Sequence, residues 1–307
     1  MNTKIDEVQI TLSTEYYIPS LAETFFRAKS VEGLSPHTLR FYKIQLKGFL
    51  DWLNSQQVHQ LEQLNPGIIR SYLSFRQEQG RKASTVNASY RPIRAFLNFT
   101  FQEYEPTLPN PILKCKPPRV PKILQAPAEL EDISRMLAAC NRKKIAGLRD
   151  YALILTLLDS CARISEVLDL RLEDFRNDDL FIQAGKGNKT RIGFISQKTR
   201  IALRRYIRAR KDSCPYIFVS QRKGRLSYSG VIHEFKFLAA KVGLAEAPTP
   251  HGLRRAGALS LLRSGANLLV VSKILGHTSI ETTTVYLRLD ADDLREQHGR
   301  FAPADRL

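Results

Sequence analysis

The sequence predicts a mostly α-helical protein of two domains, with one small β-hairpin in the C-terminal domain. Apolar residues recur at helical spacing through the first hundred positions, which favours a helical bundle. A proline-rich stretch at 107–127 then excludes a long helix. Beyond it, helical patterns flank LFIQAGKGNKTRIGFIS (180–196), where apolar and polar residues alternate around a glycine-rich turn. The 307 residues are enough for two domains, each with its own core.

Three helices are predicted early in the chain. The first spans SLAETFFRAK at 20–29. The second begins with Ser35 as N-cap and Pro36 in its first turn, and the third repeats this arrangement with Asn65 and Pro66. Each then carries one apolar stripe, as expected of helices packed in a bundle.

A fourth helix is predicted to begin near Ser84 or Thr85. Because proline lacks a backbone N–H and crowds the preceding turn, we expect Pro92 to kink or interrupt this helix. Arg81 and Lys82 lie just before it, where the unpaired N–H groups of a helix start favour phosphate.

The chain has a formal charge of +17, from 47 Lys and Arg against 30 Asp and Glu. Such an excess indicates a polyanionic partner. Nucleic acid is favoured over an anionic membrane surface, because no basic amphipathic helix stands out. Basic residues are ordinarily solvated, but positions at the helix junction, on the fourth helix and along the proline-rich stretch predict DNA contacts: Arg81, Lys82, Arg91, Arg94, Lys116, Arg119 and Lys122.

The sequence also predicts a cytoplasmic, nucleoid-associated protein with no membrane contact. No stretch approaches the roughly 20 apolar residues of a membrane span. The four cysteines are widely separated and form no CxxC pair, which favours reduced thiols over a disulfide framework or a zinc site.

The C-terminal domain is predicted to contain helices at about 128–140, 147–160, 197–211, 228–243, 251–264 and 267–275. One polar stretch of this domain precedes the predicted hairpin, and a second lies at its tip, between the two strands. CARISEVLDLRLEDF places Arg163 at a helix start, and GKGNKTR places Lys186 and Lys189 at the hairpin tip between glycines.

Two further polar stretches lie near the end of the chain. TPHGLRRAG puts His251 and Arg254 on one face of a helix for which Thr249 is the predicted N-cap. KILGHTSIETTTVY is predicted to end a helix at its glycine, turn through His277, and place Tyr286 two turns into a last helix.

Taken singly, each of these side chains is best explained as a solvated or structural residue. Together they are the components of metal-free phosphoryl transfer. Arginines bind non-bridging oxygens and stabilise the charge of the transition state. A lysine or histidine can protonate the leaving oxygen, and a tyrosine can attack as nucleophile. No carboxylate or cysteine cluster accompanies the histidines, so we expect no metal centre.

The set resembles the tyrosine recombinase (phage integrase) family, and its compact Xer-like members in particular. Order and separations fit together, and the similarity runs from about residue 20 to 290. The matching residues are Arg163 in ARISE, Lys186 in GKGNKTR, His251 and Arg254 in HGLRR, and His277 and Tyr286 in LGHTSIETTTVY.

The resemblance implies a role for each residue. Arg163 and Arg254 would bind the scissile phosphate, and His277 would help to align it. Lys186 would be the general acid toward the 5′-oxygen, with Lys189 as its rival.

Tyr286 would attack the phosphate while His251 assists transfer of its proton. The product would be a 3′-phosphotyrosyl DNA and a free 5′-hydroxyl. A 5′-hydroxyl from the partner duplex would then reseal the strand, so that four protomers exchange strands through a Holliday junction. No cofactor is implied, because the covalent bond conserves the energy.

The resemblance implies a two-domain recombinase architecture. We expect a helical core-binding domain at 1–113, a basic proline-rich linker at 114–125, a mixed α/β catalytic domain at 126–289 and a tail at 290–307. The implied partners are duplex DNA with inverted half-sites and three further protomers, with cyclic exchange of the tail. The resemblance does not decide whether a second recombinase or an accessory protein takes part. It also does not decide between resolution of dimers and integration or excision of a mobile element.

One departure from the family pattern and two alternatives accompany this prediction. The family usually has a small Thr-Gly pair just before its first arginine, where this chain has Ser160, Cys161 and Ala162. Glu166 and Asp174 are expected to be structural partners of basic groups. The alternatives are a type IB topoisomerase, which shares the chemistry, and a catalytically silent DNA-binding protein of the same fold.

Overall fold

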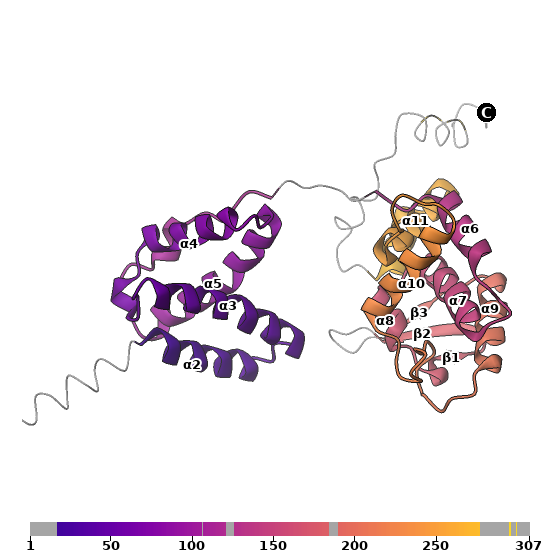
Figure 1. Cartoon of the computed structure of the whole chain (residues 1–307), viewed down its shortest axis with the longest axis horizontal. Helices are drawn as coiled ribbons and strands as arrows, with labels where there is room; N and C mark the ends of the chain where they lie inside the picture. Colours follow the sequence, from indigo (N-terminus) through magenta and orange to yellow (C-terminus); the bar gives the residue numbers. More distant parts are fainter. Residues whose placement is uncertain are drawn as a thin grey trace, which may run out of the picture. The chain divides into compact units, whose positions relative to one another are not determined.

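The computed structural model describes residues 17–105, 107–120, 126–183 and 190–276, together with positions 295 and 299. The chain divides into two compact units, Met1–Lys122 and Ile123–Leu307. Both are mostly helical, and the described strands all belong to the second unit (Figure 1). The prediction of a mostly α fold with a small sheet is therefore confirmed.

The first unit is a bundle of helices around one apolar core. Its largest buried side chains include Phe25, Phe49, Tyr72 and Phe96, each 0% exposed. The described elements of this unit are α2 (Ile18–Val31), α3 (Pro36–Ser55), η1 (Leu61–Gln63), α4 (Pro66–Glu78), α5 (Ala83–Glu103) and η2 (Pro111–Lys114).

The predicted helix starts are confirmed by their hydrogen bonds. Ser35 Oγ accepts from the backbone N–H of Thr38 at 3.2 Å, and α3 begins one residue after the serine. Asn65 Oδ1 accepts from the backbone N–H of Ile68 at 3.1 Å at the start of α4. Each cap satisfies one backbone donor that the first helical turn leaves unpaired.

Pro92 does not interrupt α5, so the expected interruption was wrong. The helix runs from Ala83 to Glu103 with Pro92 buried inside it. Val86, Ile93 and Phe96 lie on its buried side at 0% exposure. Burial of such side chains contributes roughly 1.5–3 kcal/mol each, which offsets the roughly 3 kcal/mol that an internal proline costs.

The chain after η2 stays against α4 and α5 for several residues. Arg70 donates to the carbonyl of Lys114 at 3.0 Å, and the Tyr90 hydroxyl donates to the carbonyl of Cys115 at 2.7 Å. Asn87 Nδ2 donates to the carbonyl of Pro118 at 2.9 Å. The described part of the expected linker is therefore bound to the first unit by its backbone.

The second unit is built around α7, which packs against α9 and α11. Ala152, Leu153, Ile154 and Leu157 are at most 1% exposed, as expected of a helix surrounded by other elements. The described elements of this unit are α6 (Leu130–Ala139), α7 (Ile145–Ser160), α8 (Ile164–Asp169), η3 (Leu172–Asp174), β1 (Phe175–Arg176), β2 (Asp179–Gln183), β3 (Thr190–Gly193), α9 (Gln197–Ala209), α10 (Tyr228–Lys241), α11 (Pro250–Arg263) and α12 (Leu268–Leu275).

The three strands form an antiparallel sheet in the order β1-β2-β3. Leu180 pairs with Gly193 and Ile182 pairs with Arg191 across β2 and β3. Both β2 partners are 0% exposed, whereas Ile192 of β3 is 42% exposed. Directly opposed residues share a face, so Arg191 lies on the core side of the hairpin.

No helix in the described part of the chain combines the length and the apolar character needed to cross a membrane.

Candidate active site

The site begins where α7 ends in a left-handed residue. Cys161 has φ 49° and ψ 25°, a conformation that ordinarily favours glycine, and its side chain is fully buried. Ser160 Oγ donates to the carbonyl of Thr156 at 2.6 Å and accepts from the N–H of Ala162 at 3.2 Å. The turn thereby directs the chain from α7 into α8.

Cys161 fits here because α11 offers a glycine opposite it. A Cβ on Gly257 would lie 2.9 Å from the Cys161 sulfur and 2.1 Å from the carbonyl oxygen of Leu158. The two helices therefore approach closely at this point. Burial raises the pKa of the Cys161 thiol to about 12, so the thiol remains protonated and unreactive.

Arg163 stands at the N-terminus of α8, as predicted. Its backbone N–H donates to Glu166 Oε2 at 2.9 Å, and its guanidinium donates to Glu166 Oε1 at 2.8 Å. Half of the Arg163 side chain is exposed (51%), so the guanidinium is oriented on one side and open on the other. Glu166 is thus the structural partner that the sequence predicted.

The second part of the site comes from the start of α11. Thr249 Oγ1 accepts from the N–H of Gly252 at 2.9 Å, which confirms the predicted cap. Arg254, one turn later, is 2% exposed and donates to the carbonyl of Leu275 at 2.9 Å. His251 precedes it on the exposed edge of the helix.

Arg163 and Arg254 both lie close enough to His251 for their charges to act on its imidazole. Surrounding atoms, and then the positive charges of Arg255, Arg254 and Arg163, lower the pKa of His251, although its ring keeps some exposure. The imidazole is therefore neutral at pH 7 and able to accept a proton. The structure thus places Arg163, His251 and Arg254 within electrostatic reach of one another.

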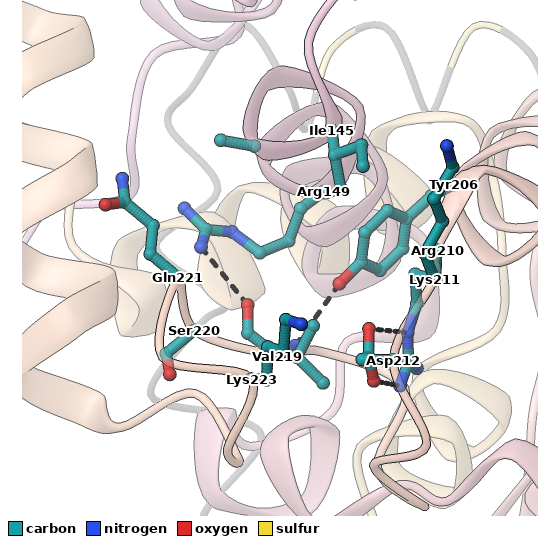
Figure 2. Close-up of a pocket in the computed structure, with 11 residues that line it drawn as sticks. Ile145, Arg149, Tyr206, Arg210, Lys211, Asp212, Val219, Ser220, Gln221 and Lys223 are labelled. Carbon is teal, nitrogen blue, oxygen red and sulfur yellow. Dashed lines mark hydrogen bonds and ion pairs between the residues drawn. The ribbon is translucent and has the colours of Figure 1, made fainter.

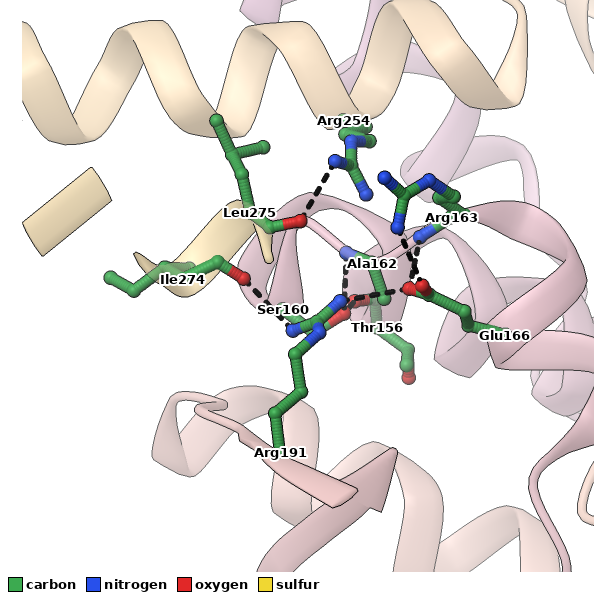
Figure 3. Close-up of polar contacts among 9 residues, drawn as sticks. All are labelled: Thr156, Ser160, Ala162, Arg163, Glu166, Arg191, Arg254, Ile274 and Leu275. Atoms are coloured by element: carbon green, nitrogen blue, oxygen red, sulfur yellow. Dashed lines mark hydrogen bonds and ion pairs between the residues drawn. The ribbon is translucent and has the colours of Figure 1, made fainter. Parts of the chain in front are cut away.

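Arg191 also belongs to this cluster, although the sequence analysis did not single it out. Its guanidinium donates to Glu166 Oε2 at 2.8 Å and to the carbonyl of Ile274 at 2.8 Å (Figure 3). A signal was present in the sequence, because alternation along the hairpin puts Arg191 in phase with Gly193 and Ile195 on the core side. An arginine at such a position needs a partner.

The described residues do not include four predicted site residues. Lys186, Lys189, His277 and Tyr286 lie outside the described residues, as does Lys122 of the predicted DNA contacts. Their flanks are described, since β2 ends at 183, β3 begins at 190 and α12 ends at 275.

Gly276 closes α12 in the left-handed conformation, with φ 66°, as predicted for this glycine. A Cβ there would lie 2.9 Å from Arg191 Nε. Both the backbone conformation and the guanidinium therefore require a residue without a side chain, one position before His277.

Within the described ranges, no group of three or more His, Cys, Asp and Glu side chains is arranged to hold a metal ion. The cluster is cationic instead. Arg163 and Arg191 share the Glu166 carboxylate (Figure 3), and Arg254 lies with Arg191 near the turn at Cys161. Such a cluster suits a phosphate group.

A separate cavity of about 280 Å³ lies at the other end of α7 (Figure 2). Arg149 lines it and is 3% exposed. Its Nε donates to Asp150 Oδ1 at 2.8 Å, a second nitrogen lies 3.1 Å from Glu234 Oε1, and a third donates to the carbonyl of Val219 at 3.2 Å. The charge of Arg149 is therefore paired with the carboxylates of Asp150 and Glu234 inside the protein.

The predicted DNA-contact residues that the structure describes are all exposed: Arg81, Lys82, Arg91, Arg94, Lys116 and Arg119. Lys82 is the residue before α5, so Arg81 and Lys82 directly precede a helix start. Arg91 and Arg94 line a hollow on the side of α5 together with Asn87 and Asn98.

Comparison with known proteins identifies the class. Residues 128–293 match the Phage integrase family, and residues 23–104 match the Phage integrase, N-terminal SAM-like domain. The chain belongs to the phage integrase family of tyrosine recombinases. The predicted family and enzyme class are therefore confirmed.

Its relatives extend along nearly the whole chain. Tyrosine recombinase XerC of Thermodesulfovibrio yellowstonii is 29% identical over 302 residues, which cover 95% of this chain and 97% of that protein. Tyrosine recombinase XerA of Thermococcus kodakarensis is 28% identical over 292 residues, with 93% and 96% covered. The prediction of a compact Xer-like member agrees with both.

Solved structures share the fold. A lambda integrase dimer bound to a COC′ core site has a TM-score of 0.74 at 16% identity, covering 91% of this chain and 80% of that one. XerH bound to palindromic difH substrate has a TM-score of 0.71 at 18% identity, covering 92% and 84%. The predicted two-part recombinase architecture is confirmed at the level of fold.

Proposed function

We propose that the chain is a site-specific DNA recombinase that cleaves and rejoins strands through Tyr286. The observation that carries this proposal is the cationic cluster of Arg163, Arg191 and Arg254, in which Arg191 and Arg254 donate to the end of α12. The stretch from 277 to 286 follows that helix directly in the sequence.

In the proposed reaction the Tyr286 phenol gives its proton to neutral His251, and the phenolate oxygen forms a bond to phosphorus. Arg163 and Arg254 neutralise the non-bridging oxygens as negative charge develops on them. The bond from phosphorus to the 5′-oxygen breaks, and Lys186 donates a proton to that oxygen. Attack by an incoming 5′-hydroxyl reverses these steps and releases the tyrosine.

The first unit would contribute to DNA binding. We assign residues 1–113 to the core-binding domain, 114–125 to the connector and 126–289 to the catalytic domain. The exposed basic residues on α5 and on the chain after η2 support phosphate contact, and each contact releases counterions, so affinity should fall steeply with salt.

The proposal extends to assembly. Four protomers would act on a duplex site with inverted half-sites, exchange strands through a Holliday junction, and contact one another through residues 290–307. Relatives of the same fold have been seen as a dimer on a core site and as a tetramer on a Holliday junction. A DNA substrate implies action in the cytoplasm, at the nucleoid.

The test uses a nicked duplex taken from DNA flanking the gene, so that the cleaved strand loses its short 5′-hydroxyl fragment and religation stops. We expect a covalent protein–DNA band on a denaturing gel, formed in EDTA and absent with Tyr286→Phe. Tight binding without a band at any flanking site would favour a silent DNA-binding protein. Relaxation of supercoils without a specific site would favour a topoisomerase.

A further inference from the structure

Arg191 connects two elements that are distant in sequence. From β3, its guanidinium reaches Glu166 on α8 at 2.8 Å and the carbonyl of Ile274 at the end of α12 at 2.8 Å. The side chain is 17% exposed. One rigid, planar group therefore spans the two elements.

Each end of this connection leads to a group in the proposed reaction. Glu166 uses one oxygen for Arg191 and the Arg163 backbone N–H, and the other for the Arg163 guanidinium. At the other end, Ile274 and Leu275 are the last residues of α12, and Arg254 donates to the carbonyl of Leu275 at 2.9 Å. The two phosphate-binding arginines are thus linked through Arg191 and the end of one helix.

Gly276 shows how closely Arg191 fits this helix end. A Cβ on Gly276 would lie 2.9 Å from Arg191 Nε and 3.2 Å from its Cδ. The guanidinium therefore lies against the backbone from which the chain continues toward His277 and Tyr286. A shift of Arg191 would shift the starting point of that stretch.

We infer that Arg191 is a positioning residue for strand cleavage, which fixes Arg163 through Glu166 and fixes the end of α12 relative to it. The inference rests on the proposed function. It concerns orientation and not DNA affinity, because both acceptors of the Arg191 guanidinium belong to the protein. A displacement of about 1 Å in an active site can cost about 100-fold in rate.

Lysine should not replace Arg191 fully. An ammonium group is a compact point charge, whereas the guanidinium holds two acceptors in a fixed plane. Arg191→Lys should keep the positive charge and at most one of the two contacts. Its cleavage rate should therefore fall between those of wild type and Arg191→Ala.

The matched control is Arg225, another arginine that bridges a backbone carbonyl and a carboxylate. Arg225 Nε donates to the carbonyl of Leu168 at 3.1 Å, and its guanidinium pairs with Asp169. Both acceptors lie at the C-terminal end of α8, away from Arg163 at the N-terminal end. Arg225→Ala should cleave at the wild-type rate.

The experiment measures single-turnover cleavage of the nicked substrate at saturating protein, together with DNA affinity and thermal unfolding. For Arg191→Ala we expect a loss of about 100-fold in cleavage with DNA affinity within about threefold of wild type. Wild-type cleavage, or an equal loss of affinity and cleavage, would overturn the inference.

A second substrate, with sulfur in place of the 5′-bridging oxygen, tests whether Arg191→Ala impairs protonation of the leaving group or another step. A thiolate leaves without protonation, so this substrate should restore a variant that lacks the general acid, Lys186→Ala. Arg191→Ala should remain slow on it, because the contacts of Arg191 lead to Arg163 and α12. Full restoration of Arg191→Ala would contradict the assignment.

If Arg191→Ala does not unfold cooperatively, Gly276→Ala tests the same contact from the other side. Its added methyl group would displace the Arg191 guanidinium, so cleavage should fall while DNA affinity is kept; unchanged cleavage would count against the inference. Failure of the proposed function is distinguishable, because wild type itself would then give no Tyr286-dependent adduct.

Discussion

The arginines at the two ends of α7 differ in how their charges are paired. At the first end, Arg149 is 3% exposed and faces two carboxylates, Asp150 and Glu234. At the other end, Arg163 is 51% exposed. It shares one described carboxylate, Glu166, with Arg191, and Arg254 lies nearby.

This difference distinguishes a structural arginine, Arg149, from one proposed to bind substrate, Arg163. Around Arg149 the two carboxylates, Asp150 and Glu234, pair with the buried guanidinium, so its charge is compensated within the protein. Around Arg163, that residue and Arg191 share one carboxylate, Glu166, and the half-exposed Arg163 guanidinium is still open to a phosphodiester. Burial alone does not make this distinction, since Arg254 is as buried as Arg149.

The largest expected effects come from removing one arginine at each end. Arg149→Ala leaves two carboxylates without their partner and should lower the free energy of unfolding by about 3–5 kcal/mol. Arg163→Ala removes a half-exposed side chain and should change it by less than about 1 kcal/mol. Urea unfolding of both variants measures this difference, and equal losses would contradict the comparison.

For the rate of DNA cleavage, Arg163→Ala should have the larger effect and Arg149→Ala the smaller. Removal of one preorganised donor typically costs about 100- to 1,000-fold in rate, which we expect for Arg163→Ala. Arg149→Ala should cleave at the wild-type rate per folded molecule. The adduct assay is run at a temperature at which unfolding curves show both variants folded.

A smaller effect is expected from two glycines that lie at the two ends. A Cβ on Gly147 would lie 2.2 Å from the carbonyl oxygen of Asn141, and one on Gly257 would lie 2.1 Å from that of Leu158. Alanine at either position should destabilise the protein by about 1–3 kcal/mol. Only Gly257→Ala should also slow cleavage, because α11 carries His251 and Arg254. Equal cleavage rates for Gly147→Ala and Gly257→Ala would contradict this expectation.

The smallest effects concern pH, and the two ends should respond in opposite directions. Burial raises the pKa of Glu166, but hydrogen bonds and charge from Arg163 and Arg191 outweigh it, and the net pKa is lowered below its ordinary 4.5. The ionised form is favoured by folding, so its contribution is present above pH 4.5 and is lost as pH falls through the folded pKa.

Asp150 behaves differently, because burial raises its pKa to about 6 despite Arg149. The stability of its protonated form is present below the ordinary value of 3.8 and is lost as pH rises toward 6. Unfolding free energies of Glu166→Gln and Asp150→Asn, each subtracted from wild type between pH 3 and 7, should therefore have opposite slopes. Parallel slopes would show that neighbouring groups dominate.

Local signals made much of the fold predictable. Ser35, Asn65 and Thr249 each cap a helix with the hydrogen bond that their side chains favour, and Gly276 ends α12 as predicted. These features depend on a few adjacent residues, which a single sequence displays.

The features that were missed depend on contacts across the fold. Pro92 is tolerated because the packing of α5 outweighs its local cost. Arg191 acquires its role from Glu166, 25 positions earlier, and from Ile274, 83 positions later. Spacing in the sequence does not reveal such distant pairs, although the core-side phase of Arg191 was visible.

The core-side position of Arg191 has a consequence for folding. If β3 slipped by one residue, Ile192 and Phe194, now 42% and 57% exposed, would turn toward the core and Arg191 would turn outward. The same slip would turn buried Ile195 outward, so the hydrophobic effect alone discriminates weakly between the two alignments. The ion pair with Glu166 exists only in the native alignment, and Gly193 leaves room there for Ile182. A charged side chain thus helps to select one strand register while the hairpin forms.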